Sequence, residues 1–97
     1  MKALFDQVSL KASKMVTNAY STSFSLGIRM LNESVREPVY AIYGFVRFAD
    51  EIVDSFEGYD KAALIADFRK QTDEAIAQRI SLNPILNSFQ HAVNHYS

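Results

Sequence analysis

Hydrophobic residues recur at helical spacing in four segments of this 97-residue chain, and no stretch shows the strict alternation of a half-buried strand. The pattern predicts an all-α fold, a helical bundle, with helices over 4–20, 38–55, 61–80 and from 84 onward. In the first of these the apolar residues at helical spacing are Leu4, Val8, Ala12, Met15 and Ala19.

Hydroxyl and proline residues set the boundaries between the first two helices. The run 21–27 is rich in Ser and Thr, whose side chains compete for backbone hydrogen bonds, so it predicts a break. We expect a short helical piece over 26–31 and a loop over 32–37. Pro38 fits the first turn of the next helix, because its missing N–H would have no partner there.

Cap signals and apolar stripes define the last two helices. Asp60 is a suitable N-cap for the third helix, and Asn83 followed by proline is the same kind of signal for the fourth. The expected buried stripes are Leu64, Ile65, Phe68, Ala75 and Ile76 in one helix, and Ile85, Leu86, Phe89 and Val93 in the other.

The segment VYAIYGFVRFADEIVD, residues 39–54, differs from an ordinary core helix. At about 100° per residue, one narrow face carries Tyr43, Arg47, Asp50 and Asp54, with Glu51 at its border. The first half is apolar all round, which predicts burial, and buried carboxylates are costly unless paired or bound to a cation. Asp50 and Asp54 are one turn apart, a geometry that suits Mg²⁺, which completes its shell with water and substrate phosphate.

A plainer interpretation of this face is a set of ion pairs. Arg47 could pair with Asp50 or Glu51 one turn away, each pair contributing roughly 0.2–0.5 kcal/mol. Asp54 would then lie at a solvated helix end. An Asp-x-x-x-Asp spacing alone does not separate the two interpretations.

Two further groups of residues have more than one interpretation. Ser21, Thr22 and Ser23 are consistent with a helix break, or with hydroxyl and N–H groups that hold a phosphate. His91 and His95 have the i,i+4 spacing of zinc ligands, but no acidic or cysteine partner is near them in the sequence.

Composition excludes several classes of function. A net charge of −1 with no basic block gives no reason to expect a nucleic-acid partner. Without cysteine there is no disulfide framework and no thiolate metal site. The longest apolar run, 39–46, is far shorter than the roughly 20 residues that span a bilayer. We expect a cytoplasmic protein, with peripheral attachment to a membrane surface as the alternative.

Several motifs together resemble the squalene/phytoene synthase family, the head-to-head prenyl diphosphate synthases. They are YSTSFS at 20–25, Arg36, and YAIYGFVRFADEIVD at 40–54. Within the family the chain is most similar to bacterial phytoene synthases, which share Ser-Phe-Ser-Leu and an aspartate motif ending in Ile-Val-Asp. Because such enzymes are much longer, the resemblance implies that residues 1–97 form the N-terminal third of one, a single incomplete domain of the isoprenoid-synthase fold.

The resemblance implies roles for the charged face. Asp50 and Asp54 match the first aspartate-rich motif, whose carboxylates bind Mg²⁺ and, through it, a substrate diphosphate. With Tyr43 and Arg47 they form the expected catalytic set. Glu51 stands where many members have a second Asp. It keeps the negative charge on a longer arm, and it is an additional candidate ligand beside Asp50 and Asp54.

The resemblance also implies substrate contacts. Ser21, Ser23, Tyr43 and Arg47 match positions that contact the diphosphate. Phe24 matches an aromatic residue at the start of the cavity for the isoprenoid chain.

The implied activity is a prenyl transfer that joins two prenyl diphosphates through a cyclopropyl intermediate, with loss of diphosphate. The phytoene type joins two geranylgeranyl diphosphates in carotenoid biosynthesis. The alternatives are a squalene- or dehydrosqualene-type synthase that uses farnesyl diphosphate, or a non-catalytic helical binding module. No second aspartate-rich motif follows Asp54, so we expect the 97 residues alone to be inactive. We also expect the central helix to leave an exposed apolar groove or to self-associate.

Overall fold

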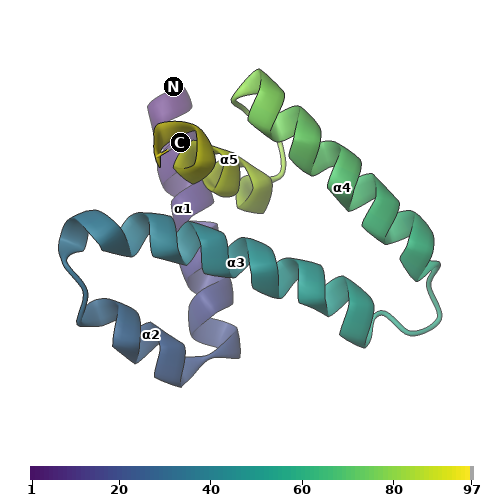
Figure 1. Ribbon diagram of the computed structural model, residues 1–97, viewed down its shortest axis with the longest axis horizontal. Helices are drawn as coiled ribbons and strands as arrows, with labels where there is room; N and C mark the ends of the chain where they lie inside the picture. Colours follow the sequence, from purple (N-terminus) through teal and green to yellow (C-terminus); the bar gives the residue numbers. More distant parts are fainter. Residues whose placement is uncertain (97) are drawn as a thin grey trace.

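In a computed structural model, which describes residues 1–96, the chain forms five helices, and these residues contain no strand. They are α1 (Lys2–Tyr20), α2 (Thr22–Arg29), α3 (Glu33–Ser55), α4 (Lys61–Gln78) and α5 (Pro84–Tyr96). The long helix α3 crosses α1, while α5 packs on the other half of α1 and α4 leans away from α3 (Figure 1). The all-α prediction is confirmed.

The break after α1 is a single residue. Ser21 has extended backbone angles (φ −152°, ψ 96°) that end α1, and its Oγ accepts a hydrogen bond from the Phe24 N–H at 3.1 Å. The hydroxyl run therefore caps and begins α2, because Ser is a strong N-cap residue. The predicted short helix over 26–31 was placed too late: α2 begins at Thr22.

The start of α3 corrects a second predicted boundary. Asn32 caps the helix by accepting the Ser34 N–H at 3.0 Å, so α3 begins at Glu33 and not at Pro38. Pro38 lies inside the helix and leaves the Ser34 carbonyl without its usual N–H partner. The Tyr96 hydroxyl donates to that carbonyl oxygen at 3.3 Å, so α5 supplies a replacement hydrogen bond.

Small residues allow α1 and α3 to pack closely. Ser9, Ser13 and Thr17 line the buried face of α1. A Cβ built on Gly44 of α3 would lie 3.1 Å from Ser13 Cβ and 3.2 Å from Ser13 Cα. Two of the hydroxyls bond within the helix, Ser9 to the Phe5 carbonyl at 2.8 Å and Thr17 to the Ser13 carbonyl at 2.9 Å.

Several larger apolar residues of α1 and α3 face outward. The apolar stripe of α1 is largely exposed, with Leu4 at 53% and Met15 at 71%. On α3 the side opposite α1 carries an exposed apolar ridge of valines and isoleucine: Val35, Ile42, Val46 and Val53. The central helix thus exposes apolar surface as a ridge and not as the expected groove, and self-association remains a prediction.

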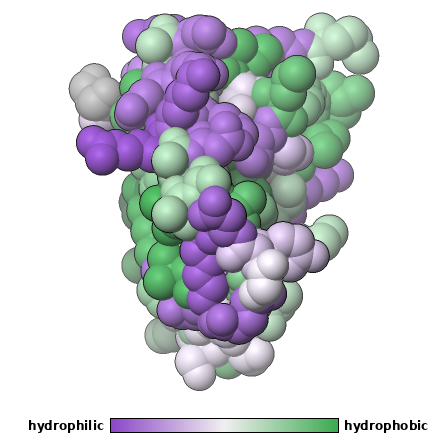
Figure 2. Space-filling model, turned by 90° about the vertical axis from the view of Figure 1, so that its right-hand side faces the viewer, coloured by the Kyte–Doolittle hydropathy of each residue, from purple (hydrophilic) through white to green (hydrophobic). Residues whose placement is uncertain are grey.

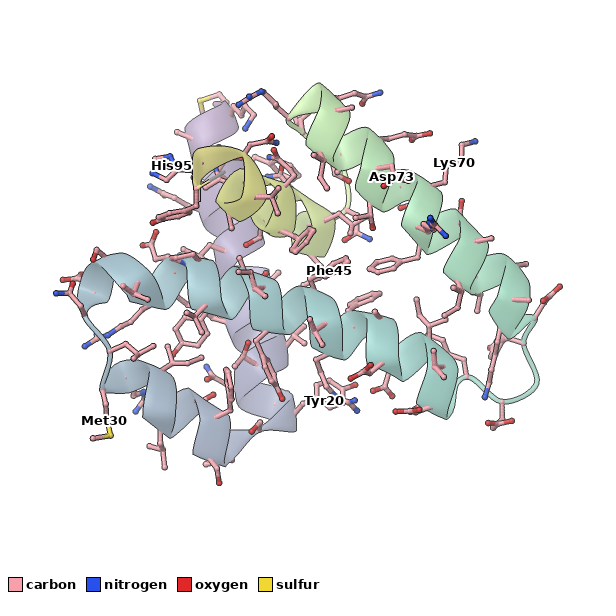
Figure 3. The ribbon with its side chains drawn as sticks, in the orientation of Figure 1. Tyr20, Met30, Phe45, Lys70, Asp73 and His95 are labelled. Carbon is pink, nitrogen blue, oxygen red and sulfur yellow. The ribbon has the colours of Figure 1, made fainter. Side chains whose placement is uncertain are left out.

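Aromatic rings join α3 to α4 and α5. The Phe45 ring stacks on Phe89 of α5, with centroids 3.8 Å apart, and on Phe68 of α4 at 5.4 Å (Figure 3). In the predicted stripe of α5, Ile85 and Leu86 are buried, whereas Phe89 and Val93 are half-buried.

The predicted stripe of α4 is only partly buried. Ala75 is buried and Phe68 stacks on α3, but Leu64 and Ile65 are each 38% exposed. Hydrophobic side chains accordingly reach the surface among hydrophilic ones on the side of the molecule formed by α4 (Figure 2).

A polar network joins α5 to α1. Asn87, fully buried on α5, donates to Asp6 Oδ1 at 2.9 Å and to Ser9 Oγ at 3.0 Å. Partial burial by itself would raise the pKa of Asp6, but hydrogen bonds from Asn87 and Lys2 outweigh it and lower that pKa. Buried amides need such partners, so this network fixes how α5 sits on α1.

None of the helices in residues 1–96 is both long and apolar enough to cross a membrane.

The close contact of α1 with α3 gives a paired prediction. Gly44→Ala should lower the free energy of unfolding by about 1 kcal/mol, because the clash with the Ser13 backbone outweighs the gain in helix propensity. The matched control Gly27→Ala, in the open part of α2, should raise it by about 0.5–1 kcal/mol. Urea unfolding followed by circular dichroism measures both, and an equal gain for the two variants would contradict the close packing.

Candidate functional site

The corner between α1 and α2 lies against the middle of α3. The Phe24 ring stacks on Tyr43, with centroids 4.3 Å apart and planes inclined by 21°. The Arg47 guanidinium lies over the Tyr20 ring, 4.4 Å from its centroid, where Tyr20 ends α1 below α3 (Figure 3). The structure therefore brings Phe24, Tyr43 and Arg47 into one region, and their contact with a substrate remains a prediction.

The two predicted serines lie at the start of α2, next to these aromatic contacts. Ser21 is half-buried, and its Oγ is occupied as an acceptor by the N-cap hydrogen bond, which leaves its hydroxyl proton free to donate. Ser23 is exposed in the first helical turn. Within residues 1–96 neither side chain hydrogen-bonds to α3, so their role toward a diphosphate remains a prediction.

Glu51 is held by several partners. Its carboxylate accepts from Arg47 Nη2 at 3.0 Å, with the two side chains 20% and 25% exposed, respectively. Hydrogen bonding to Ser55, then to Tyr20, and the Arg47 charge together lower the pKa of Glu51. Hydrogen bonding to Glu51 raises the pKa of Tyr20. The ion-pair interpretation is thus correct for Arg47 with Glu51 and wrong for Arg47 with Asp50.

The sequence prediction missed Tyr20 as a member of this cluster. The sequence predicts that the first helix ends at Tyr20 and includes Tyr20 in the motif YSTSFS, but it assigns the ring no role. Nothing in the helical pattern of α1 indicates that this ring lies under Arg47. A hollow of about 210 Å³ beside it is lined by Val16, Tyr20, Phe48, Glu51 and Phe56.

Asp50 and Asp54 have no such partners. Both side chains are exposed, and neither forms an ion pair with any of residues 1–96. They lie near the C-terminal end of α3, where the helix dipole is negative and the last turn holds no basic residue. Lys61 comes near this end, but it donates to the Val53 carbonyl at 2.9 Å and to Glu57 at 2.6 Å. This part of α3 therefore has unneutralised negative charge.

The chemistry of these two carboxylates fits Mg²⁺. Among residues 1–96 no group of three or more Asp, Glu, His or Cys side chains is placed to hold a metal ion without other ligands. Mg²⁺ does not need such a cage, since it commonly takes one or two carboxylates and fills its shell with water and substrate phosphate. Asp50 and Asp54 are the residues that would hold it.

The apolar ridge of α3 runs beside the charged face. Ile42 and Val46, 46% and 48% exposed, lie within one turn of Tyr43 and Arg47 on the same helix. Phe24 adds an exposed aromatic ring from α2. An anionic group and a hydrocarbon chain could therefore be accommodated side by side on α3.

A second hollow, of about 320 Å³, lies where α1 and α5 meet the first half of α3. Asp6, Glu37, His91 and His95 contribute to its lining, and the two imidazole rings are stacked with centroids 5.9 Å apart. None of the predicted site residues lines it. In residues 1–96 the histidines do not belong to any group that could hold a metal ion.

Two comparisons with known proteins indicate the same family. Residues 17–97 match the family described as squalene/phytoene synthase. Over 54 residues the chain is 43% identical to a presqualene diphosphate synthase of Zymomonas mobilis subsp. mobilis (strain ATCC 31821 / ZM4 / CP4), a match that covers 56% of this chain and 19% of that protein. The matched part thus spans about a fifth of the relative. No solved structure matches the chain.

The unpaired carboxylates lead to a stability prediction. The double variant Asp50→Asn and Asp54→Asn should raise the free energy of unfolding by about 0.5–1 kcal/mol without Mg²⁺, because it removes repulsion at the negative end of α3. Urea unfolding in the presence of EDTA is the measurement. Asp73→Asn, on the exposed part of α4, is the control and should change little. A loss of stability in the double variant would show that the aspartates are structural.

Proposed function

Because the chain belongs to the squalene/phytoene synthase family, we propose that the charged face of α3 binds the diphosphate of a prenyl diphosphate through Mg²⁺. In the longer protein this face would form one wall of a site for head-to-head prenyl transfer. The single observation that carries the proposal is the pair Asp50 and Asp54, which are exposed, one turn apart and without a cationic partner in residues 1–96.

Each residue of the face has a distinct task in this proposal. Asp50 and Asp54 would hold the metal, and Mg²⁺ would supply Lewis-acid stabilisation of the departing diphosphate. Arg47 adds a fixed positive charge that favours the anion as the C–O bond breaks and the electron pair leaves with the diphosphate oxygen. Ser21 and Ser23, at the start of α2 beside Phe24, would donate hydroxyl hydrogen bonds to the diphosphate.

The aromatic and apolar surface suits the rest of such a substrate. Loss of diphosphate leaves an allylic carbocation, which aromatic faces stabilise and which must be kept from water. The stacked Phe24 and Tyr43 rings lie beside the charged face, and the ridge of Ile42 and Val46 continues it with hydrocarbon. This juxtaposition favours a prenyl diphosphate over a polar phosphate ester.

Two candidates for chain length have support. The Ser-Phe-Ser-Leu run and the Ile-Val-Asp ending favour the phytoene type, with two geranylgeranyl diphosphates. The name of the Zymomonas relative favours a squalene-type protein that uses farnesyl diphosphate. Titration of the protein with farnesyl and with geranylgeranyl diphosphate distinguishes the two candidates. The diphosphate whose isoprenoid length fits the site should bind more tightly.

Calorimetric titration tests the proposed site directly. Binding of farnesyl or geranylgeranyl diphosphate should require Mg²⁺. It should weaken at least about tenfold in the variant Asp50→Asn with Asp54→Asn, as expected for loss of metal-binding groups. Asp73→Asn is the matched control. Equal binding with and without Mg²⁺, or equal binding by the double variant, would favour a helical module whose charges only form ion pairs.

Turnover is a separate expectation. After Asp54 the described residues contain no second Asp-x-x-x-Asp spacing, so the metal and the departing diphosphate would be held from one side only. We therefore expect the 97 residues to bind substrate without converting it. Extraction and chromatography after incubation with Mg²⁺ and each diphosphate is the check, and formation of phytoene or presqualene diphosphate would contradict the expectation.

A further inference from the structure

We propose that Tyr20 and Glu51 are positioning residues that hold the Arg47 guanidinium ready for the diphosphate, and that Glu51 is not a metal ligand. The inference rests on the proposed function of the α3 face. It assigns a role to Tyr20, and it separates Glu51 from the aspartates on either side of it in the sequence.

Arg47 is held from two directions by two different helices. The Tyr20 ring, at the end of α1, lies under the guanidinium plane at 4.4 Å, and Glu51 of α3 binds Nη2 at 3.0 Å. A guanidinium has five N–H donors in a rigid fork, and in residues 1–96 only Nη2 has an acceptor. The remaining donors are free for an anion while the position of the group is fixed.

The surroundings of Glu51 differ from those of Asp50 and Asp54. Its carboxylate interacts with Arg47, Ser55 and Tyr20, whereas the two aspartates have no cationic partner in the described chain. A Glu side chain at this position reaches Arg47 one turn back. An Asp side chain, shorter by one methylene, would reach it less well. The longer arm is thus suited to holding the arginine.

Holding Arg47 has two consequences for the site. An arginine that is already ordered loses less side-chain entropy when it binds an anion. Without its two partners, Arg47 could instead turn to Asp50, three residues along the same helix face, and neutralise a carboxylate that the metal needs. The cluster of Tyr20, Arg47 and Glu51 therefore keeps the positive and negative groups of the face apart.

Binding of inorganic diphosphate at saturating Mg²⁺ tests the proposal. Glu51→Gln and Tyr20→Leu should each weaken binding about threefold to tenfold, whereas Tyr20→Phe, which keeps the ring, should have a smaller effect. The Mg²⁺ concentration for half-maximal binding should not change. Both losses should disappear in an Arg47→Gln background, because the residues act through Arg47. The matched control is Glu57→Gln, which breaks another i,i+4 pair, with Lys61 at 2.6 Å.

A measurement without ligand reports on the same cluster. The ring current of Tyr20 should shift the Arg47 side-chain resonances in NMR spectra, and this shift should be lost in Tyr20→Leu and kept in Tyr20→Phe. Circular dichroism verifies that each variant is folded.

Different failures point to different conclusions. A raised Mg²⁺ requirement for Glu51→Gln would identify Glu51 as a metal ligand and overturn the proposal. So would losses that persist in the Arg47→Gln background, or wild-type affinity in Glu51→Gln and Tyr20→Leu. If the unaltered chain does not bind diphosphate at all, the proposed function fails and this inference fails with it.

Discussion

The rest of the structure depends on the close approach of α3 to α1 at Gly44. Because Gly44 has no side chain, α3 can lie against the Ser13 backbone, and the buried face of α1 is accordingly narrow and made of Ser9, Ser13 and Thr17. This contact sets the position of the end of α1. There Tyr20 reaches Arg47 on α3, and the next helix begins one residue later. The geometry of the candidate site therefore follows from how closely two helices can pack.

The surface of the long helix α3 has three parts with different roles. One side, with Gly44 and the buried Ala41, packs on other helices, and the opposite side is an exposed apolar ridge. The charged face lies between them. On that face the arginine is paired and ordered, whereas Asp50 and Asp54 are left without a cation. Such an arrangement costs stability unless a metal binds, which is the usual compromise at a functional site.

The helical fold and the charged face of α3 follow from the sequence because hydrophobic periodicity and helix geometry are local properties. Details that depend on tertiary packing did not follow. Hydropathy favours burial of Leu4 and Met15, but the need for close packing buries the small polar residues of α1 instead. Pro38 is tolerated inside α3 because the hydroxyl of Tyr96, distant in the sequence, donates to the Ser34 carbonyl that Pro38 leaves without an N–H donor. The role of Tyr20 was likewise not predictable from the sequence, because its partner Arg47 lies on another helix.

The most direct measurement of the central claim is where a bound metal lies. Mn²⁺, added with inorganic diphosphate to the isotope-labelled chain, broadens the NMR signals of nuclei close to it. If α3 carries the metal and diphosphate site, the broadening should be strongest around Arg47, Asp50 and Asp54 and at the start of α2. Broadening that is spread over the acidic residues of α4, or unaffected by Asp50→Asn with Asp54→Asn, would contradict it.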